Sequence, residues 1–358
     1  MMDHDRIVPL RFSLADWAET APGSLHRAVA GLVCDRNTQP TPEIGWTQNK
    51  MVEVIRAADE NDDGALLDLH KTLYLIYEVA FAHPLSDVVV HEFNPWLLEI
   101  RNALEVYWLK HELEEVRDLV DDHCATTKVM GHLMALARVK TKTDGLVEDF
   151  LAQRATKEQF AHFVLSDAPL NYRFYDALVL AATHFTESVK WEVSHHFWDE
   201  CGLGSREDAH TWKFSTVLDS MGLVLPAVPI WEDWRPYAGY NLYFLFGFRR
   251  EHYFKALGNL AMPELFDPDR DRAVVQGIER LCSDNLESFA YFYDHIEGDE
   301  KHGRSWLEHV VQPIVSRYPE SAHDFLVGGS LRMTAMRRYN EYLASCFHID
   351  SRSDRLCQ

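Results

Sequence analysis

The chain has 358 residues, of which 47% are hydrophobic and 25% charged, so it can bury a sizeable core. Its formal net charge of −21 argues against binding to nucleic acid or to anionic membranes, because both require clustered Lys and Arg. No apolar run reaches the roughly 18 residues of a membrane span, and the N-terminus lacks a signal-peptide pattern. The cysteines are scattered without a CxxC pair. We therefore expect a soluble, cytoplasmic protein with reduced thiols.

Helical periodicity dominates the chain. An early example is a set of residues that share one helical face, namely Leu66, Leu67, His70, Leu73 and Tyr74. Stretches of alternating polar and apolar residues are short. The pattern predicts an all-α fold, with helices in chain order near 90–120, 144–167, 170–200, 207–222, 238–262, 270–294 and 295–315.

Proline and glycine mark the expected breaks, with Pro169, Gly202–Gly204 and Pro263–Pro268 among them. Residues 140–155 contain the best boundary between domains. We predict an N-terminal helical region over 1–150, which serves packing or dimerisation, and a second domain over 151–358. His91-Glu92, His111-Glu112 and Asp121–His123 of the first region are interpreted as surface or capping groups.

The strongest functional motif is H-x-x-x-D-x-x-H, formed by His295, Asp299 and His302. At about 100° per residue, these side chains fall within a stripe about 60° wide on one helix. Two imidazoles and a carboxylate on one stripe can bind a first-row metal such as iron. Gly298, in the middle of this motif, costs helix stability, which suggests that something must approach closely there.

A second motif surrounds a predicted helix–turn–helix. Gly202 or Gly204 would end one helix in a left-handed cap, and Ser205 would begin the next. Glu200 then lies in the last turn of the first helix and His210 in the second turn of the following one. A tight turn would let both side chains reach the same point.

Glu264 is a weaker candidate, because a single Glu beside Pro263 is more often a capping or surface group. A rival ligand set uses the i, i+3 pairs Glu192/His195, Glu207/His210 and Asp299/His302, since ferritin-like bundles build two-iron sites from such pairs. Short motifs of this kind also arise by chance.

Taken in order, these motifs resemble those of the haem-oxygenase-like diiron oxidases, over roughly residues 155–320. The resemblance implies a haem-oxygenase-like helical bundle in which two irons are bound by Glu200, His210, Glu264, His295, Asp299 and His302. Some family members supply one more carboxylate, for which Asp176, Glu187 and Glu192 are open alternatives. Pro263 could displace Glu264 by kinking its helix.

Within the family, the motifs are most similar to those of the diiron N-oxygenases of natural-product biosynthesis. The resemblance implies an oxygenase that uses two irons, O2 and an external reductant, such as a reductase or a small molecule, to N-oxygenate a small amine, guanidine or aminoimidazole. It also suggests a homodimer. The alternatives are a diiron oxidase that cleaves a C–C bond of an amino or fatty acid, and a non-catalytic iron-binding protein. No nicotinamide, flavin or P-loop fingerprint is present, and the motifs do not fit haem oxygenation.

Overall fold

The computed structural model describes residues 23–34, 42–120, 125–183 and 187–349, and every regular element within these ranges is a helix. The predicted all-α fold is therefore confirmed. Residues 121–123 of the first region lie outside the described residues. No described helix is both long and apolar enough to cross a bilayer.

The chain forms two compact units, the first made of residues 1–114 and 226–241 and the second of 115–225 and 242–358. Within the first unit, Asp62 caps a helix by accepting a hydrogen bond from the backbone of Ala65. The hydroxyl of Tyr77 donates a 2.7 Å hydrogen bond to Glu105 inside the core. The helices of this unit are α2 (Leu25–Cys34), α3 (Pro42–Asp59), α4 (Asp63–Ala80), the 3-10 turn η2 (Asp87–His91), nearly all of α5 (Pro95–Val116) and the first half of α11 (Trp234–Phe248).

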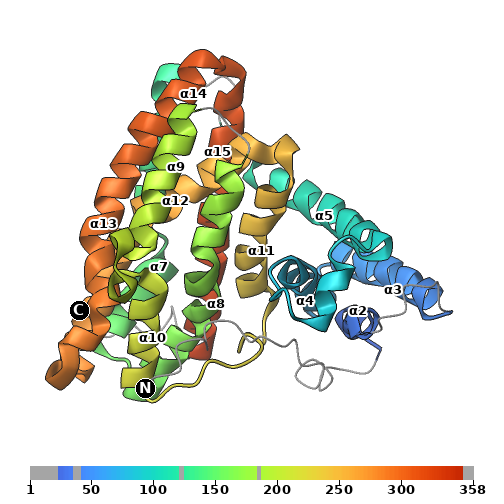
Figure 1. Cartoon of the computed structure of the whole chain (residues 1–358), viewed down its shortest axis with the longest axis horizontal. Helices are drawn as coiled ribbons and strands as arrows, with labels where there is room; N and C mark the ends of the chain where they lie inside the picture. The colour runs from blue at the N-terminus through green and yellow to red at the C-terminus, as the bar shows by residue number, and fades with distance from the viewer. Residues whose placement is uncertain (1–22, 35–41, 121–124, 184–186, 350–358) are drawn as a thin grey trace. The chain divides into compact units, whose positions relative to one another are not determined.

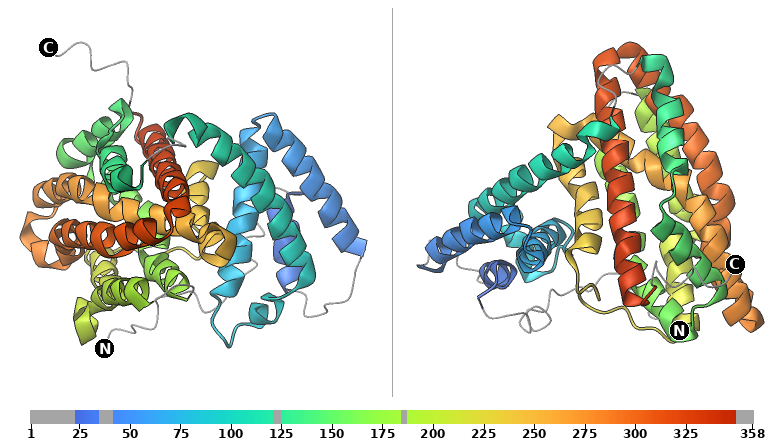
Figure 2. Two further views of the ribbon diagram at one scale, coloured as in Figure 1. Left: turned by 90° about the horizontal axis from the view of Figure 1, so that it is seen from above. Right: turned by 180° about the vertical axis from the view of Figure 1, so that it is seen from behind.

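The second unit is a bundle arranged around α12 (Tyr253–Leu281), which packs along α13 (Ala290–Trp306) and α15 (Ala322–Cys346) (Figures 1 and 2). Glycines let α12 and α15 approach closely. A Cβ at Gly258 would lie 2.2 Å from the carbonyl oxygen of Phe325, and one at Gly328 would lie 2.0 Å from that of Lys255. The other α-helices are α6 (Val129–Arg138), α7 (Lys142–Gln153), α8 (Lys157–Ala182), α9 (Glu187–Glu200), α10 (His210–Ser220) and α14 (Gln312–Arg317).

Several predicted helix ends were wrong. Pro169 lies inside α8, and Pro263 and Pro268 lie inside α12. A proline removes one backbone hydrogen bond, yet both helices continue, because tertiary packing along a long helix outweighs that local loss. The predicted helix 238–262 is two helices, α11 and α12, separated at 249–252, and the predicted 270–294 segment is split between α12 and α13.

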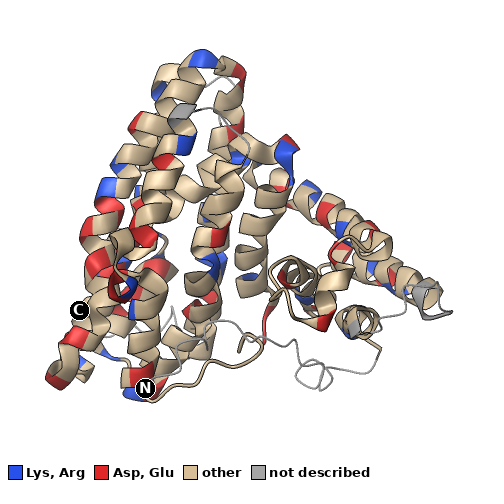
Figure 3. Cartoon of the chain, in the orientation of Figure 1, with Lys and Arg blue, Asp and Glu red and all other residues tan. Residues whose placement is uncertain are grey.

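Charged side chains of both signs follow the helices. Figure 3 shows Lys and Arg interspersed with Asp and Glu along α13. The hydrogen bonds of Lys213 to Asp294, at 2.6 Å, and of Arg272 to Glu300 are examples between helices of the second unit. These ion pairs neutralise part of the acidic charge, and the excess of acidic residues leaves the chain with its net charge of −21.

Candidate metal centre

Helix α9 carries a buried polar stripe made of Glu192, His196 and Glu200, which are 2%, 1% and 5% exposed. The spacing i, i+4, i+8 places these side chains along the same side of the helix. Burying charged and polar groups is costly unless they find partners. The stripe therefore marks α9 as the first wall of a polar site inside the second unit.

The turn after α9 is unusually tight. Gly202, Leu203 and Gly204 all have positive φ, at 76°, 53° and 93°. A Cβ at Gly202 would lie 2.3 Å from the backbone nitrogen of Ala209, so only glycine lets the chain fold back this closely. The predicted left-handed cap is thus present. The predicted place of His210 was wrong, since this residue is the first of α10 and not part of its second turn.

Helices α12 and α13 form the facing walls. Gly303 lets them touch, because a Cβ there would lie 2.8 Å from the carbonyl oxygen of Glu264. Glu264 on α12 is 4% exposed, and Asp299 and His302 on α13 are 6% and 8% exposed. Pro263 does not turn Glu264 away from the site.

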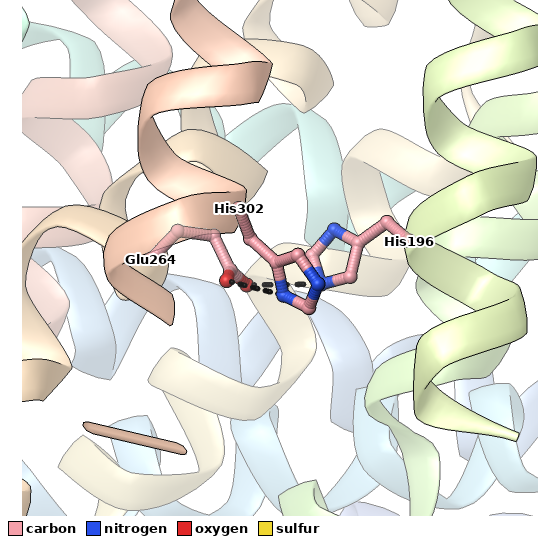
Figure 4. Close-up of side chains that lie close together, drawn as sticks. All are labelled: His196, Glu264 and His302. Atoms are coloured by element: carbon pink, nitrogen blue, oxygen red, sulfur yellow. Dashed lines mark ion pairs between the residues drawn. The ribbon is translucent and has the colours of Figure 1, made fainter. Parts of the chain in front are cut away.

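The first group of metal-type ligands consists of His196, Glu264 and His302, from α9, α12 and α13 (Figure 4). Oε1 of Glu264 is 3.4 Å from Nε2 of His196, and Oε2 is 3.5 Å from Nδ1 of His302. Both ring nitrogens of His196, Oε2 of Glu264 and Nδ1 of His302 are buried without a hydrogen-bond partner among the described residues. One cation placed between these atoms would give a partner to Glu264, to Nδ1 of His302 and to Nε2 of His196.

The second group consists of Glu200, His210 and His295. Nδ1 of His210 lies 2.7 Å from Oε2 of Glu200, and the rings of His210 and His295 are 4.4 Å apart. In each group, one atom from every residue lies within 4.8 Å of the others, as the ligands of one ion require. Imidazole nitrogens and carboxylate oxygens are suitable ligands for iron, so the residues of both groups fit this metal.

Electrostatics favour cations at this place. Burial raises the pKa of Glu200, but His210 and His196 outweigh it and hold this pKa well below its usual value. Burial and the neighbouring carboxylates, Glu264 first, raise the pKa of Asp299 well above its usual value. Asp299 is outside both groups, but its interaction with Glu264 and Glu200 places it in the field of the same cluster. Metal ions would remove this repulsion between carboxylates.

Two outer partners orient the histidines of α13. Nε2 of His302 donates a 2.8 Å hydrogen bond to Oδ2 of Asp199, and Nδ1 of His295 donates a 2.6 Å hydrogen bond to the carbonyl oxygen of Tyr291. Such partners fix the tautomer and leave the other ring nitrogen for a metal. His302 therefore offers Nδ1, and His295 offers Nε2.

The structure brings together most of the residues singled out in the sequence, and adds His196. Glu200, His210, Glu264, His295 and His302 fall into the two groups, with Asp299 beside them. Sequence reasoning missed His196. The signal that could have found it is its place one turn before Glu200, on the helical face that also carries the apolar Val189 and Val193.

The three carboxylates that the sequence left as alternatives for an additional ligand have different surroundings. Asp176 binds Arg173 at 3.2 Å. Glu192 lies 3.2 Å from Nδ1 of His309, and the side chain of Glu187 lies outside the described residues. His195, from the rival i, i+3 set, is half exposed, with its side chain 3.9 Å from Asp199, and belongs to neither group.

Comparison with known proteins agrees with this arrangement. Residues 161–337 match the family model described as iron-containing redox enzyme. That part of the chain belongs to the haem-oxygenase-like family of iron-containing redox enzymes. Both ligand groups lie within the matched residues, which supports their assignment to iron.

Two individual proteins are also similar. Nitrosourea synthase of Streptomyces achromogenes subsp. streptozoticus is 27% identical over 136 residues, which are 37% of this chain and 28% of that protein. The chain thus matches little more than a quarter of that relative. A CADD-like protein of unknown function from Nostoc punctiforme PCC 73102 shares the fold, with a TM-score of 0.50 and 16% identity over 62% of this chain and 97% of that one.

Proposed function

We propose that the protein is a diiron oxygenase that transfers oxygen from O2 to a nitrogen atom of a small amine, guanidine or aminoimidazole. The observation that carries the proposal is the pair of buried ligand groups joined by one carboxylate. Oε1 of Glu200 is 3.6 Å from Nε2 of His196, and its Oε2 is 2.7 Å from Nδ1 of His210. With one oxygen toward each group, Glu200 would be placed to serve ions held at both positions.

In this proposal, one iron is held by His196, Glu264 and His302, and the other by Glu200, His210 and His295. Asp299, whose carboxyl group interacts electrostatically with both Glu264 and Glu200, is a further ligand in this proposal. When bound, the irons supply the electrons that activate O2, and an external reductant restores them. The protein itself holds the ligands apart from bulk water, as the low exposure of His196, Glu200 and Glu264 indicates.

The choice of nitrogen as the atom oxidised rests on the likeness to nitrosourea synthase, whose name describes a product with oxidised nitrogen. It is also supported by a pocket beside the two groups, in which four carboxylates outnumber two lysines and which the ligand histidines His210 and His302 also line. Carboxylates favour a nitrogen compound that can carry positive charge.

The first test is elemental analysis after anaerobic loading with Fe(II), for the wild type and for His302→Ala. We expect about two irons per chain, and fewer in the variant, because His302 supplies a ligand nitrogen in a buried site. An iron content that the variant leaves unchanged would remove the proposed centre.

The second test adds O2 and candidate amines to the loaded protein and follows product mass. Added oxygen on nitrogen supports the proposal. Loss of carbon would instead identify a C–C-cleaving oxidase, and slow iron oxidation that no substrate accelerates would identify an iron-binding protein without turnover.

A further inference from the structure

A cavity of about 570 Å³ lies beside the metal-ligand groups, in the range of small-molecule sites. Its walls come from α9, the turn over 202–208, the start of α10 and one face of α13. His210 and His302 line it, so a molecule in the cavity would reach one histidine of each group.

Two lysines, Lys213 and Lys301, line this cavity beside its carboxylates, and most of the charged groups already have partners. Lys213 lies between Asp294, at 2.6 Å, and Asp208, at 3.2 Å. Asp199 accepts the hydrogen bond of His302. These contacts leave one lining carboxylate to consider, that of Glu192.

Glu192 is 2% exposed, and its Oε2 has no hydrogen-bond partner among the described residues. Nδ1 of His309 lies 3.2 Å from this oxygen without completing a hydrogen bond, and the same nitrogen is 3.0 Å from Oγ of Ser305. A buried carboxylate without a hydrogen bond is costly and gains most from a charged donor. Glu192 therefore offers the cavity a carboxylate oxygen that lies 3.2 Å from the His309 ring and still lacks a hydrogen bond among the described residues.

Gly298 keeps the cavity open. It lines the cavity from α13, and a Cβ at this position would meet no atom of the described residues within 4 Å. A glycine inside a helix lowers stability by roughly 0.5–1 kcal/mol relative to alanine, and here no neighbouring helix requires it. Free space beside His302 is what the glycine provides.

We propose that this cavity is the substrate site and that Glu192 binds a cationic nitrogen group of the substrate, a protonated amine or a guanidinium. Glu192 precedes His196 by one turn of α9, about 6 Å along the axis. The bound cation is thus set apart from the nitrogen that meets the irons, which must be unprotonated to react. This inference rests on the proposed oxygenase function, whose substrate it narrows to compounds with such a cationic group.

The test uses two probes of the same shape, n-butylguanidinium and neutral n-butylurea. Their binding is measured by calorimetric titration of Fe(II)-loaded protein without O2, and of metal-free protein. We expect the wild type to prefer the guanidinium by about tenfold or more, as for a charge-assisted hydrogen bond. Glu192→Gln should abolish this preference and leave the iron content unchanged.

Asp208→Asn is the matched control, because it removes a negative charge from the same cavity, but one already paired with Lys213. It should keep the preference for guanidinium. Gly298→Leu should lower the binding affinity for both probes, because the larger side chain fills the cavity, and the iron content should stay unchanged.

Three outcomes would overturn the inference. Equal binding of the two probes by the wild type would remove the cation site. Loss of iron in Glu192→Gln would make Glu192 a metal ligand, and an undiminished preference in that variant would place the cation elsewhere. If the wild type binds no iron, the proposed function fails, while the probe preference of the metal-free protein still decides the role of Glu192.

Discussion

Glu200 follows His196 by one turn of α9, and its Oε1 lies 3.6 Å from Nε2 of His196. The two residues nevertheless belong to different ligand groups. Two residues one helical turn apart therefore serve the two groups. Helix α9 thus contributes a ligand to each group, whereas α12 and α13 complete the first group and α10 and α13 complete the second.

His196 should be essential for binding at one of the two positions. We expect His196→Ala to lose about one iron per chain. Only Glu264 and His302 of the first group would then remain to hold the iron at that position. Iron content measured after anaerobic loading gives the answer. His195→Ala is the control on the next residue, whose half-exposed side chain belongs to neither group. Iron loss in the control alone would favour the ferritin-like ligand set.

Asp199 should act on iron through His302. Asp199→Asn cannot accept the same charge-assisted hydrogen bond from Nε2, so the tautomer of His302 is no longer fixed. We expect iron affinity to fall by about 10- to 100-fold, as for other outer partners of ligand histidines. The imidazole nitrogen resonances of His302, recorded on the metal-free protein above pH 9 where the ring is neutral, report the tautomer directly. Asp294→Asn, which breaks only the contact with Lys213, should retain wild-type affinity.

Iron binding should release protons. Burial lowers the pKa of His302, but Glu264 and Asp199 outweigh it and raise this pKa to about 9. The metal-free protein therefore carries this histidine protonated at pH 7, and a metal must displace the proton. Iron affinity should rise with pH up to about 9 and then level off. Calorimetric enthalpies that do not depend on the ionisation heat of the buffer would contradict this expectation.

The titration of His295 should make the stability of the metal-free protein depend on pH. Burial, and then the charge of His210, lower its pKa from 6.5 to about 4. Between these values the unfolded chain binds more protons than the folded one, so the free energy of unfolding should fall as pH decreases from about 6.5 to 4. His295→Gln should show a weaker decrease in urea unfolding over this range.

Two glycines of α13 should respond oppositely to alanine. Gly298→Ala adds a side chain in open space and should raise the free energy of unfolding by up to about 1 kcal/mol. Gly303→Ala would press a Cβ against the carbonyl oxygen of Glu264 at 2.8 Å and should lower it by about 1–3 kcal/mol. Denaturant unfolding of the metal-free variants measures both. Equal effects at the two positions would contradict the packing described for α12 and α13.

The sequence alone determined the helical fold and most of the candidate site. The repeat of apolar residues is a local property of the chain, and H-x-x-x-D-x-x-H places His295, Asp299 and His302 on one stripe whatever the stripe faces. The tight glycine turn likewise needs only local geometry. Glu264 entered through resemblance, because a single carboxylate carries no spacing of its own.

Only the tertiary structure decided which side chains meet. His196 and His195 are neighbours with the same chemistry, and packing against α12 and α13 buries one and leaves the other half exposed. Tertiary packing also carried α8 and α12 through their prolines. The hydrogen bond from His302 to Asp199 and the open space at Gly298 both depend on how neighbouring helices are placed around α13. Local sequence fixes what a helix can present, but the neighbours that surround it determine what each side chain can bind.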